Sequence, residues 1–279
     1  SFQVIGDMST DIAVCCWVND SWIPLTTHNW TPNHSYTTLN YTDYAKYLGT
    51  MTLTLDRISN VEMSDEKKAL LMAETHLGRG WLAFLLYDFY GPIPIPTLED
   101  LKNPLDEVIE PRATQEEMTN FIETELTECV DDMLDPVVGY SQQYGHANKA
   151  AAWSLLSRLY LNAKVYIGQE KYTECIDACK KVIASGYTLD PEYKAIFCAD
   201  NDHSVEMIFP VRYEGDQTMT WGGMTAFINW GAADLKDEVN GKDAWQGVRA
   251  KSSLLRLFEK ENASEKDMRK SMLHTELTT

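Results

Sequence analysis

Tryptophans and polar side chains alternate in one early segment, CCWVNDSWIPLTTHNWTPNHSY, which covers residues 15–36. Sugar rings present flat, weakly polarised C–H faces, so aromatic rings serve as platforms for them while amides and acids hydrogen-bond to the hydroxyls. No helical stripe is apparent here, and three tryptophans in one loop are hard to bury together. Alternatively, one or two of these rings are buried against the scaffold and only the rest is exposed. The candidate contacts are Trp17, Trp22, Asn29, Trp30 and Asn33.

A second aromatic stretch runs from Arg212 to Trp245, where rings are separated by glycines and acidic residues. Loops commonly carry function when a rigid scaffold holds them. The candidates for ligand contact in this stretch are Tyr213, Trp221 and Trp230. The alternative is a covering flap whose rings pack on the helices.

The densest cluster of rings lies elsewhere, in GRGWLAFLLYDFYGPIPIP at residues 78–96. Its apolar run is far shorter than the ~20 residues that cross a bilayer, and Asp88 interrupts it. Spacings of three and four residues place Leu77, Trp81 and Phe84 on one helix stripe. We therefore expect these rings to form core, not a membrane span or a ligand platform.

Catalytic and metal-binding signatures are not found. The sequence holds no GxSxG, no HExxH, no phosphate-binding glycine loop and no convincing Cys/His pair. Asp200, Asn201, Asp202 and Glu206 could hold calcium, but they lack the glycine and the regular alternation of a calcium loop, so a turn is the better interpretation. We predict no catalysis, no cofactor and no metal.

Composition limits the class of partner. The chain has 279 residues, of which 44% are hydrophobic, as in a folded globular protein. It carries 24 basic and 42 acidic residues, a formal net charge of -18. Because this charge repels polyanions and no basic stripe offsets it, we predict no nucleic-acid partner.

Apolar spacing predicts a helical scaffold. Helices are expected over residues 44–58, 64–90, 114–134, 148–166 and 170–184. Ser64 should cap the second helix and Gly91 should end it, while Thr114 and Glu117 form a TxxE capping box. A short irregular strand is expected at residues 207–213, followed by glycine-rich loop.

The segment 159–182 resembles a tetratricopeptide repeat. Small residues at Ala163 and Cys175 lie on either side of a turn at Gly168, which lets two helices approach closely and stack on neighbouring pairs. The predicted fold class is all-α, mainly α-helical, with tetratricopeptide-like hairpins plus an irregular loop and short-strand region. We expect one incomplete domain, 1–279, with a helical scaffold at 42–186 and an irregular ligand-side region at 187–279.

Several segments, in order, resemble the SusD/RagB family, the outer-membrane glycan-capture lipoproteins of Bacteroidota. The resemblance is carried by AETHLGRGWLAFLLYDFYGPIPI (73–95), PRATQEEMTNFIETEL (111–126), ANKAAAWSLLSRLYLNAKVY (147–166), YTECIDACKKVIASGYTL (172–189), NDHSVEMIFPVRY (201–213) and KDMR (266–269). These segments cover nearly all of this chain but correspond to only the middle of a family member. We therefore expect an interior portion of a longer protein, with its lipid anchor outside this sequence.

The resemblance implies binding without catalysis. It suggests a cell-surface protein of the outer membrane that captures a glycan, or in some members a peptide, and passes it to a SusC-like TonB-dependent transporter. It slightly favours Trp22, Asn29 and Trp30, because family members commonly draw binding residues from this early loop.

Two other functions stay open from the residues alone. A helical-barrel glycoside hydrolase also combines aromatic platforms with acids, but it needs two carboxylates about 5 to 10 Å apart, and no acid pairs with the aromatic loops in a telling way. A tetratricopeptide scaffold that binds peptides should show further repeats of ~34 residues, and none follows Gly186.

Overall fold

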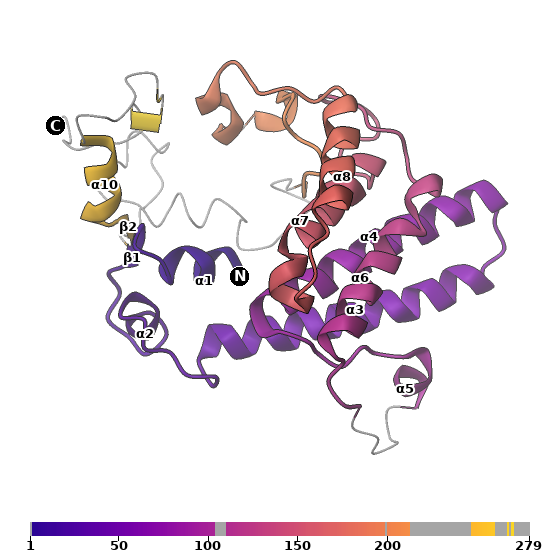
Figure 1. Ribbon diagram of the computed structural model, residues 1–279, viewed down its shortest axis with the longest axis horizontal. Coiled ribbons are helices and arrows are strands. Elements are labelled where there is room, and N and C mark those ends of the chain that lie inside the picture. The colour runs from indigo at the N-terminus through magenta and orange to yellow at the C-terminus, as the bar shows by residue number, and fades with distance from the viewer. Residues whose placement is uncertain are drawn as a thin grey trace. The chain divides into compact units, whose positions relative to one another are not determined.

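The protein is mainly α-helical (Figure 1), which confirms the predicted fold class. The computed structural model describes residues 2–103, 110–198, 200–212, 247–259, 267, 269 and 270. The chain divides into two compact units. The larger comprises residues 41–211, which include the predicted scaffold of 42–186, and the smaller comprises residues 1–40 and 212–279.

In chain order the elements are α1 (Phe2–Met8), β1 (Ala13–Cys15), α2 (Ile23–Thr26), α3 (Ser35–Asn60), α4 (Asp65–Tyr90), α5 (Leu98–Lys102), α6 (Gln115–Thr127), α7 (Lys149–Ile167), α8 (Tyr172–Ala184), β2 (Val248–Ala250) and α10 (Ser252–Glu259). The longest helices, α3 and α4, have 26 residues each. Short 3-10 turns lie at Val130–Asp132, Tyr193–Phe197 and Asn201–His203.

The predicted capping residues hold the helix ends. The Ser64 side chain accepts a hydrogen bond from the amide of Lys67 at the start of α4, and Gly91 ends that helix with a φ of 72°. Thr114 and Glu117 make both hydrogen bonds of a capping box before α6. These contacts satisfy backbone groups that a helix end leaves without partners, so the local sequence sets where α4 and α6 begin.

The larger unit is built from neighbouring helices α4, α6, α7 and α8. The α4 stripe predicted from the sequence is core, with Leu77 fully buried and Phe84 1% exposed. Gly80 allows α6 to come close, because a Cβ there would lie 2.9 Å from a methyl carbon of Leu126. A larger residue at this position would require the side chain of Leu126 or one of the two helices to shift.

Helices α7 and α8 form the predicted tetratricopeptide-like hairpin (Figure 1). Asn148 caps α7 by accepting hydrogen bonds from two backbone amides, and Gly168 ends it in the left-handed conformation. Ala163 is fully buried and Cys175 is 9% exposed, so small side chains do lie where the two helices meet. Close helix packing therefore follows from residue size, as the repeat pattern predicted.

Charged groups tie the helices of the larger unit together. Glu125 of α6 is buried and contacts His76 Nδ1 at 3.0 Å and Arg79 NH1 at 3.3 Å, both on α4. Burial lowers the pKa of Arg79, and the charge of Glu125 opposes that shift. On α6, Glu123 accepts hydrogen bonds from the Tyr160 hydroxyl at 2.9 Å and from Lys171 Nζ at 2.6 Å.

Two sequence predictions about local structure were wrong. Helix α6 ends at Thr127, not near residue 134, because the chain tightens into the 3-10 turn Val130–Asp132 while Met133 still reaches the core. Residues 207–212 form no strand. The carbonyl of Ile208 instead accepts a hydrogen bond from Asn148 Nδ2 at 2.7 Å, and the apolar side chains there pack on the helices. Apolar content indicated burial correctly but not backbone conformation.

Candidate functional site

The early aromatic loop belongs to the smaller unit, where a two-stranded antiparallel sheet fixes its start. Strands β1 and β2 pair Ala13 with Ala250 and Cys15 with Val248. Directly after β1, the amide of Cys16 donates to the carbonyl of Gly247 at 2.7 Å. Segments more than 230 residues apart in the sequence are therefore joined at the base of the loop.

Trp22 is a core residue of this unit. It is 4% exposed and packs with Met8, Cys15 and Leu25. Its ring also lies 5.5 Å from that of Trp17 and 4.9 Å from that of Tyr36, centre to centre. A buried ring has no free face for a ligand, so we leave Trp22 out of the proposed contacts.

Hydrogen bonds close the loop on itself. The Asn19 side chain accepts from the amides of Ser21 and Trp22 at 3.0 and 3.2 Å, which forms the turn before α2. His34 is buried, and its Nε2 lies 2.9 Å from the carbonyl oxygen of Ser21. The two ends of the loop are therefore held together around the short helix α2.

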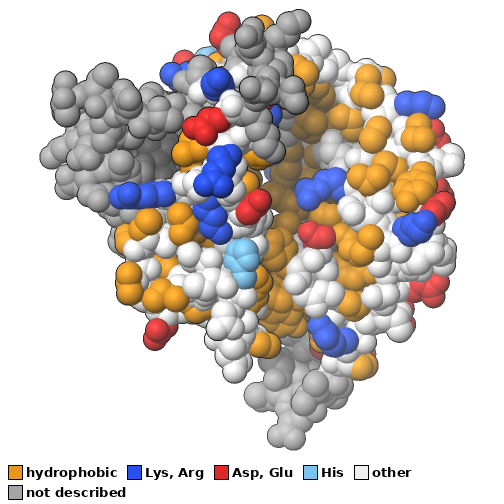
Figure 2. All heavy atoms as spheres, turned by 60° about the vertical axis from the view of Figure 1, so that its left-hand side comes forward, with side chains coloured by type: hydrophobic (Ala, Val, Ile, Leu, Met, Phe, Trp, Pro, Cys, Tyr) orange, Lys and Arg blue, Asp and Glu red, His pale blue; other side chains and the backbone are white. Residues whose placement is uncertain are grey.

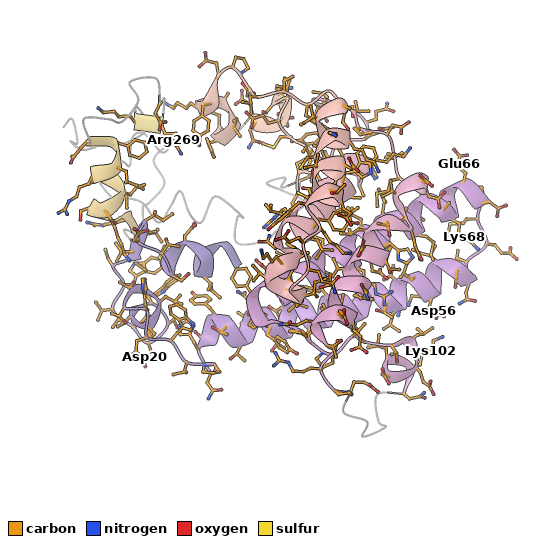
Figure 3. The ribbon with its side chains drawn as sticks, in the orientation of Figure 1. Asp20, Asp56, Glu66, Lys68, Lys102 and Arg269 are labelled. Carbon is orange, nitrogen blue, oxygen red and sulfur yellow. The ribbon has the colours of Figure 1, made fainter. Side chains whose placement is uncertain are left out.

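The outer part of the loop presents an exposed tryptophan among polar side chains. Trp30 is 40% exposed, and Asn29 and Asn33 are exposed beside it in the sequence. His28 adopts a φ of 56°, and its ring lies 6.2 Å from that of Trp30 in an edge-on arrangement. Asp20 lies on the same loop, ahead of α2 (Figure 3). An indole flanked by amides can stack on an apolar face while the amides hydrogen-bond to hydroxyls.

The predicted contact residues of this loop thus differ in their exposure to solvent. Trp30, Asn29 and Asn33 are open to solvent, Trp22 is buried, and Trp17 is half-buried. The other candidates, Tyr213, Trp221 and Trp230, lie outside the described residues. His28 belongs to the polar run of this loop but was not among the predicted contacts; its ring lies beside that of Trp30, and no sequence signal indicated its positive φ, which is uncommon for residues other than glycine.

Two of the four residues considered for calcium, Asn201 and Glu206, make hydrogen bonds to the backbone of neighbouring segments. Asn201 Nδ2 donates to the carbonyl of Ile196 at 2.9 Å, and Glu206 Oε1 accepts from the amide of Asp190 at 2.7 Å. Within the described ranges, no group of three or more His, Cys, Asp or Glu side chains could hold a metal ion.

The surface of the described residues mixes side-chain types. Figure 2 shows basic and acidic side chains scattered among apolar ones on the face in view. Of the helices that the structure describes, none combines the length and the apolar character that crossing a bilayer requires.

The fold defines a class of mainly helical proteins with tetratricopeptide-like hairpins. Comparison with known proteins narrows this class, because a family described as "Starch-binding associating with outer membrane" matches residues 2–161. The chain belongs to this SusD-like family, as the sequence resemblance predicted.

One curated relative is the starch-binding protein SusD of Bacteroides thetaiotaomicron. It is 30% identical over 258 residues, which are 91% of this chain and 45% of that protein. The chain therefore spans less than half the length of this relative.

Solved structures share the fold. A SusD superfamily protein from Parabacteroides distasonis matches with a TM-score of 0.77 and 18% identity, over 93% of this chain and 54% of that one. A laminarin-binding SusD-like protein matches with a TM-score of 0.76 and 18% identity, over 92% of this chain and 58% of that one. At these identities the likeness concerns the fold alone.

Proposed function

We propose that this chain is the glycan-binding part of a surface protein of the outer membrane, and that it binds without catalysing a reaction. The observation that carries the proposal is the exposed indole of Trp30, which lies between the exposed amide side chains of Asn29 and Asn33 in the loop. This combination suits a sugar, whose C–H faces stack on rings and whose hydroxyls bond to amides.

The relatives support a carbohydrate as the ligand class. The family description and the curated relative both name starch, and one structural relative is named as laminarin-binding. We include Trp17, Tyr213, Trp221 and Trp230 as further candidate contacts, with Trp17 limited to the part of its ring that is open to solvent.

The second part of the proposal is delivery of the glycan to a SusC-like TonB-dependent transporter by a lipid-anchored protein at the cell surface. The hairpin of α7 and α8 supports a protein partner, because it exposes apolar side chains that would bury area in a complex. Leu161, Val165, Ile176 and Ile183 are 58%, 80%, 53% and 75% exposed. Ile183→Glu should reduce co-purification of such a transporter, whereas unchanged co-purification would count against this surface.

The glycan proposal is tested by calorimetric titration with starch and laminarin oligosaccharides. We expect wild-type protein to bind at least one of them, and Trp30→Ala to weaken that binding by about tenfold, the scale of a central aromatic contact. Trp30→Phe keeps a ring and should retain most of the affinity. Phe197→Ala is a matched control, since Phe197 is 53% exposed and lies in the larger unit. Trp221→Ala tests the second aromatic stretch, residues 212–245, in the same titration.

The same titration separates the rival functions. Release of new reducing ends during incubation with the glycans would indicate a hydrolase and contradict the proposal. Binding of peptides with no affinity for any glycan would favour a tetratricopeptide scaffold.

A further inference from the structure

Three aromatic rings gather in the larger unit, on segments that the proposed function does not use; two of them are exposed and that of Tyr144 is half-buried. The ring of Tyr140 lies 5.5 Å from that of Tyr144 at an interplanar angle of 40°, and 6.1 Å from that of His203 at 65°. Tyr140 is 58% exposed, and the side chain of His203 is 73% exposed. We call these three residues the Tyr140 surface. The exposed ring of Tyr140 can offer its apolar body to a ligand and its hydroxyl to a hydrogen bond.

The loop that carries Tyr140 and Tyr144 is fixed at its base. Leu134 and Asn148 form a bridge, and the amide of Lys149 donates to the carbonyl of Leu134 at 3.0 Å. The side chain of Lys149 also contacts Asp135 at 2.7 Å. Both ends of the loop therefore leave the scaffold from one point, at the start of α7.

Two further contacts hold the neighbouring chain in place. Asn148 Nδ2 donates to the carbonyl of Ile208 at 2.7 Å, which holds the segment that follows His203 against the start of α7. At the end of the loop, His146 Nδ1 lies 2.8 Å from Glu74 Oε1 of α4. The rings of the Tyr140 surface thus come from two segments that are anchored to the same helices, so the surface is largely formed before any ligand arrives.

Polar side chains lie on the same segments as the rings. Gln142 and Gln143 are exposed on the same loop, and Asp202 precedes His203 in its 3-10 turn. A tilted and an edge-on ring pair, with amides and a carboxylate on the same segments, can offer an aromatic face and polar partners to a saccharide, by the same chemistry as at Trp30. A protein partner would be expected to find a larger, more apolar centre.

The adjoining hollow limits the form of the ligand. It is lined by residues of the loop and of segment 207–210, including Tyr144 and His146, and has a volume of about 10 Å³. That is room for about one water molecule. A ligand must therefore lie across the exposed rings, as an extended glycan chain can, and cannot enter the protein there.

We propose that the Tyr140 surface is a second saccharide-binding subsite, which contacts a polysaccharide in addition to the Trp30 loop. The proposal rests on the proposed function for the ligand class, but it places this contact on different residues in the other unit. A second contact on one polymer raises overall affinity through effective concentration, whereas a short oligosaccharide that reaches one site gains nothing.

The test is affinity electrophoresis in gels that contain soluble starch or laminarin. Tyr140→Ala and His203→Ala should each weaken the polysaccharide-dependent retardation by about 2- to 10-fold, the range of one aromatic contact. Tyr140→Phe keeps the ring and should behave as wild type. Tyr172→Ala is the matched control, because Tyr172 is 43% exposed on α8 and outside the surface. Circular dichroism of each variant verifies that it is folded.

The outcomes distinguish this proposal from the proposed function. If wild type is retarded, Trp30→Ala is impaired and folded Tyr140→Ala matches the Tyr172→Ala control, the second subsite is refuted while the proposed function stands. If wild type is retarded in neither gel, both fail. Loss of retardation in Tyr140→Ala, with recovery in Tyr140→Phe, supports the subsite.

Discussion

The indole ring of Trp17 lies directly against the α-carbon of Gly247. A Cβ placed on Gly247 would come within 2.5 Å of two carbons of that ring, a distance that real Cβ atoms do not reach. The same glycine accepts the amide of Cys16 through its carbonyl, so the backbone contact and the ring contact lie next to each other. The loop that bears Trp30 therefore starts from a junction at which any larger residue in place of Gly247 would require Trp17 or the backbone to move.

Gly247→Ala tests this junction. We expect a destabilisation of the smaller unit by about 1–3 kcal/mol, because the added methyl group must displace either the Trp17 ring or the strand. Thermal unfolding followed by tryptophan fluorescence measures it. Gly6→Ala is the control, since nothing lies within 4 Å of its Cβ position in α1, and alanine should raise stability slightly there. Equal stability of the two variants would contradict the close contact.

The buried carboxylate of Glu125 should be the most sensitive charged group of the helical unit. Glu125→Gln leaves Arg79 without its buried counter-charge, so we expect a loss of about 3–5 kcal/mol in the free energy of unfolding. Urea denaturation measures the change. The matched control is Asp56→Asn, which removes an ion pair with Lys102 at 3.0 Å whose lysine side chain is 51% exposed (Figure 3). That pair should contribute less than about 1 kcal/mol, so comparable losses would be evidence against our account.

Stability should fall in alkali because of Tyr160. Burial raises the pKa of this hydroxyl, and so does its hydrogen bond to the carboxylate of Glu123. Since the folded-state pKa lies above the unfolded value of about 10, this stabilisation is complete below pH of about 10 and is lost as pH rises through the folded-state pKa. Tyr160→Phe should therefore flatten the alkaline part of the stability profile. Parallel profiles for wild type and Tyr160→Phe would disprove the assignment.

Asn148 should have two separable roles. Its Oδ1 accepts from the amides of Ala150 and Ala151, while its Nδ2 donates to the carbonyl of Ile208. Asn148→Asp keeps the cap and loses the donor, whereas Asn148→Ala loses both. We expect Asn148→Ala to cost about 1 kcal/mol more than Asn148→Asp in urea denaturation. Hydrogen exchange near Ile208 should rise in both variants, and protection equal to wild type would argue against the tether.

The sequence predicted the helical part of the fold well because local and tertiary signals agree there. Ser64, Gly91 and Thr114 mark helix ends by their own chemistry, and the apolar stripe of α4 is the core face. Tertiary contacts determine where α6 ends and which backbone conformation residues 207–212 adopt. No local pattern encodes such contacts, of which the hydrogen bond from Asn148 to Ile208 is one.

The site was predicted less completely, for a physical reason. Trp22 and Trp30 have similar polar neighbours in the sequence, yet one is 4% exposed and the other 40%. Met8, Leu25 and Tyr36 pack against Trp22 in the folded smaller unit, and no local pattern around Trp22 encodes these contacts. The rings of the Tyr140 surface come together from segments about sixty residues apart, so sequence spacing could not reveal them.

Oxidation of tryptophan by N-bromosuccinimide, mapped by mass spectrometry with and without a bound glycan, tests the central claim most directly. Trp30 should be oxidised in the free protein and protected when the glycan that binds in calorimetry is present, while Trp22 should resist oxidation in both samples because it is 4% exposed. Equal oxidation of Trp30 with and without saturating glycan would contradict the claim that this loop binds the sugar.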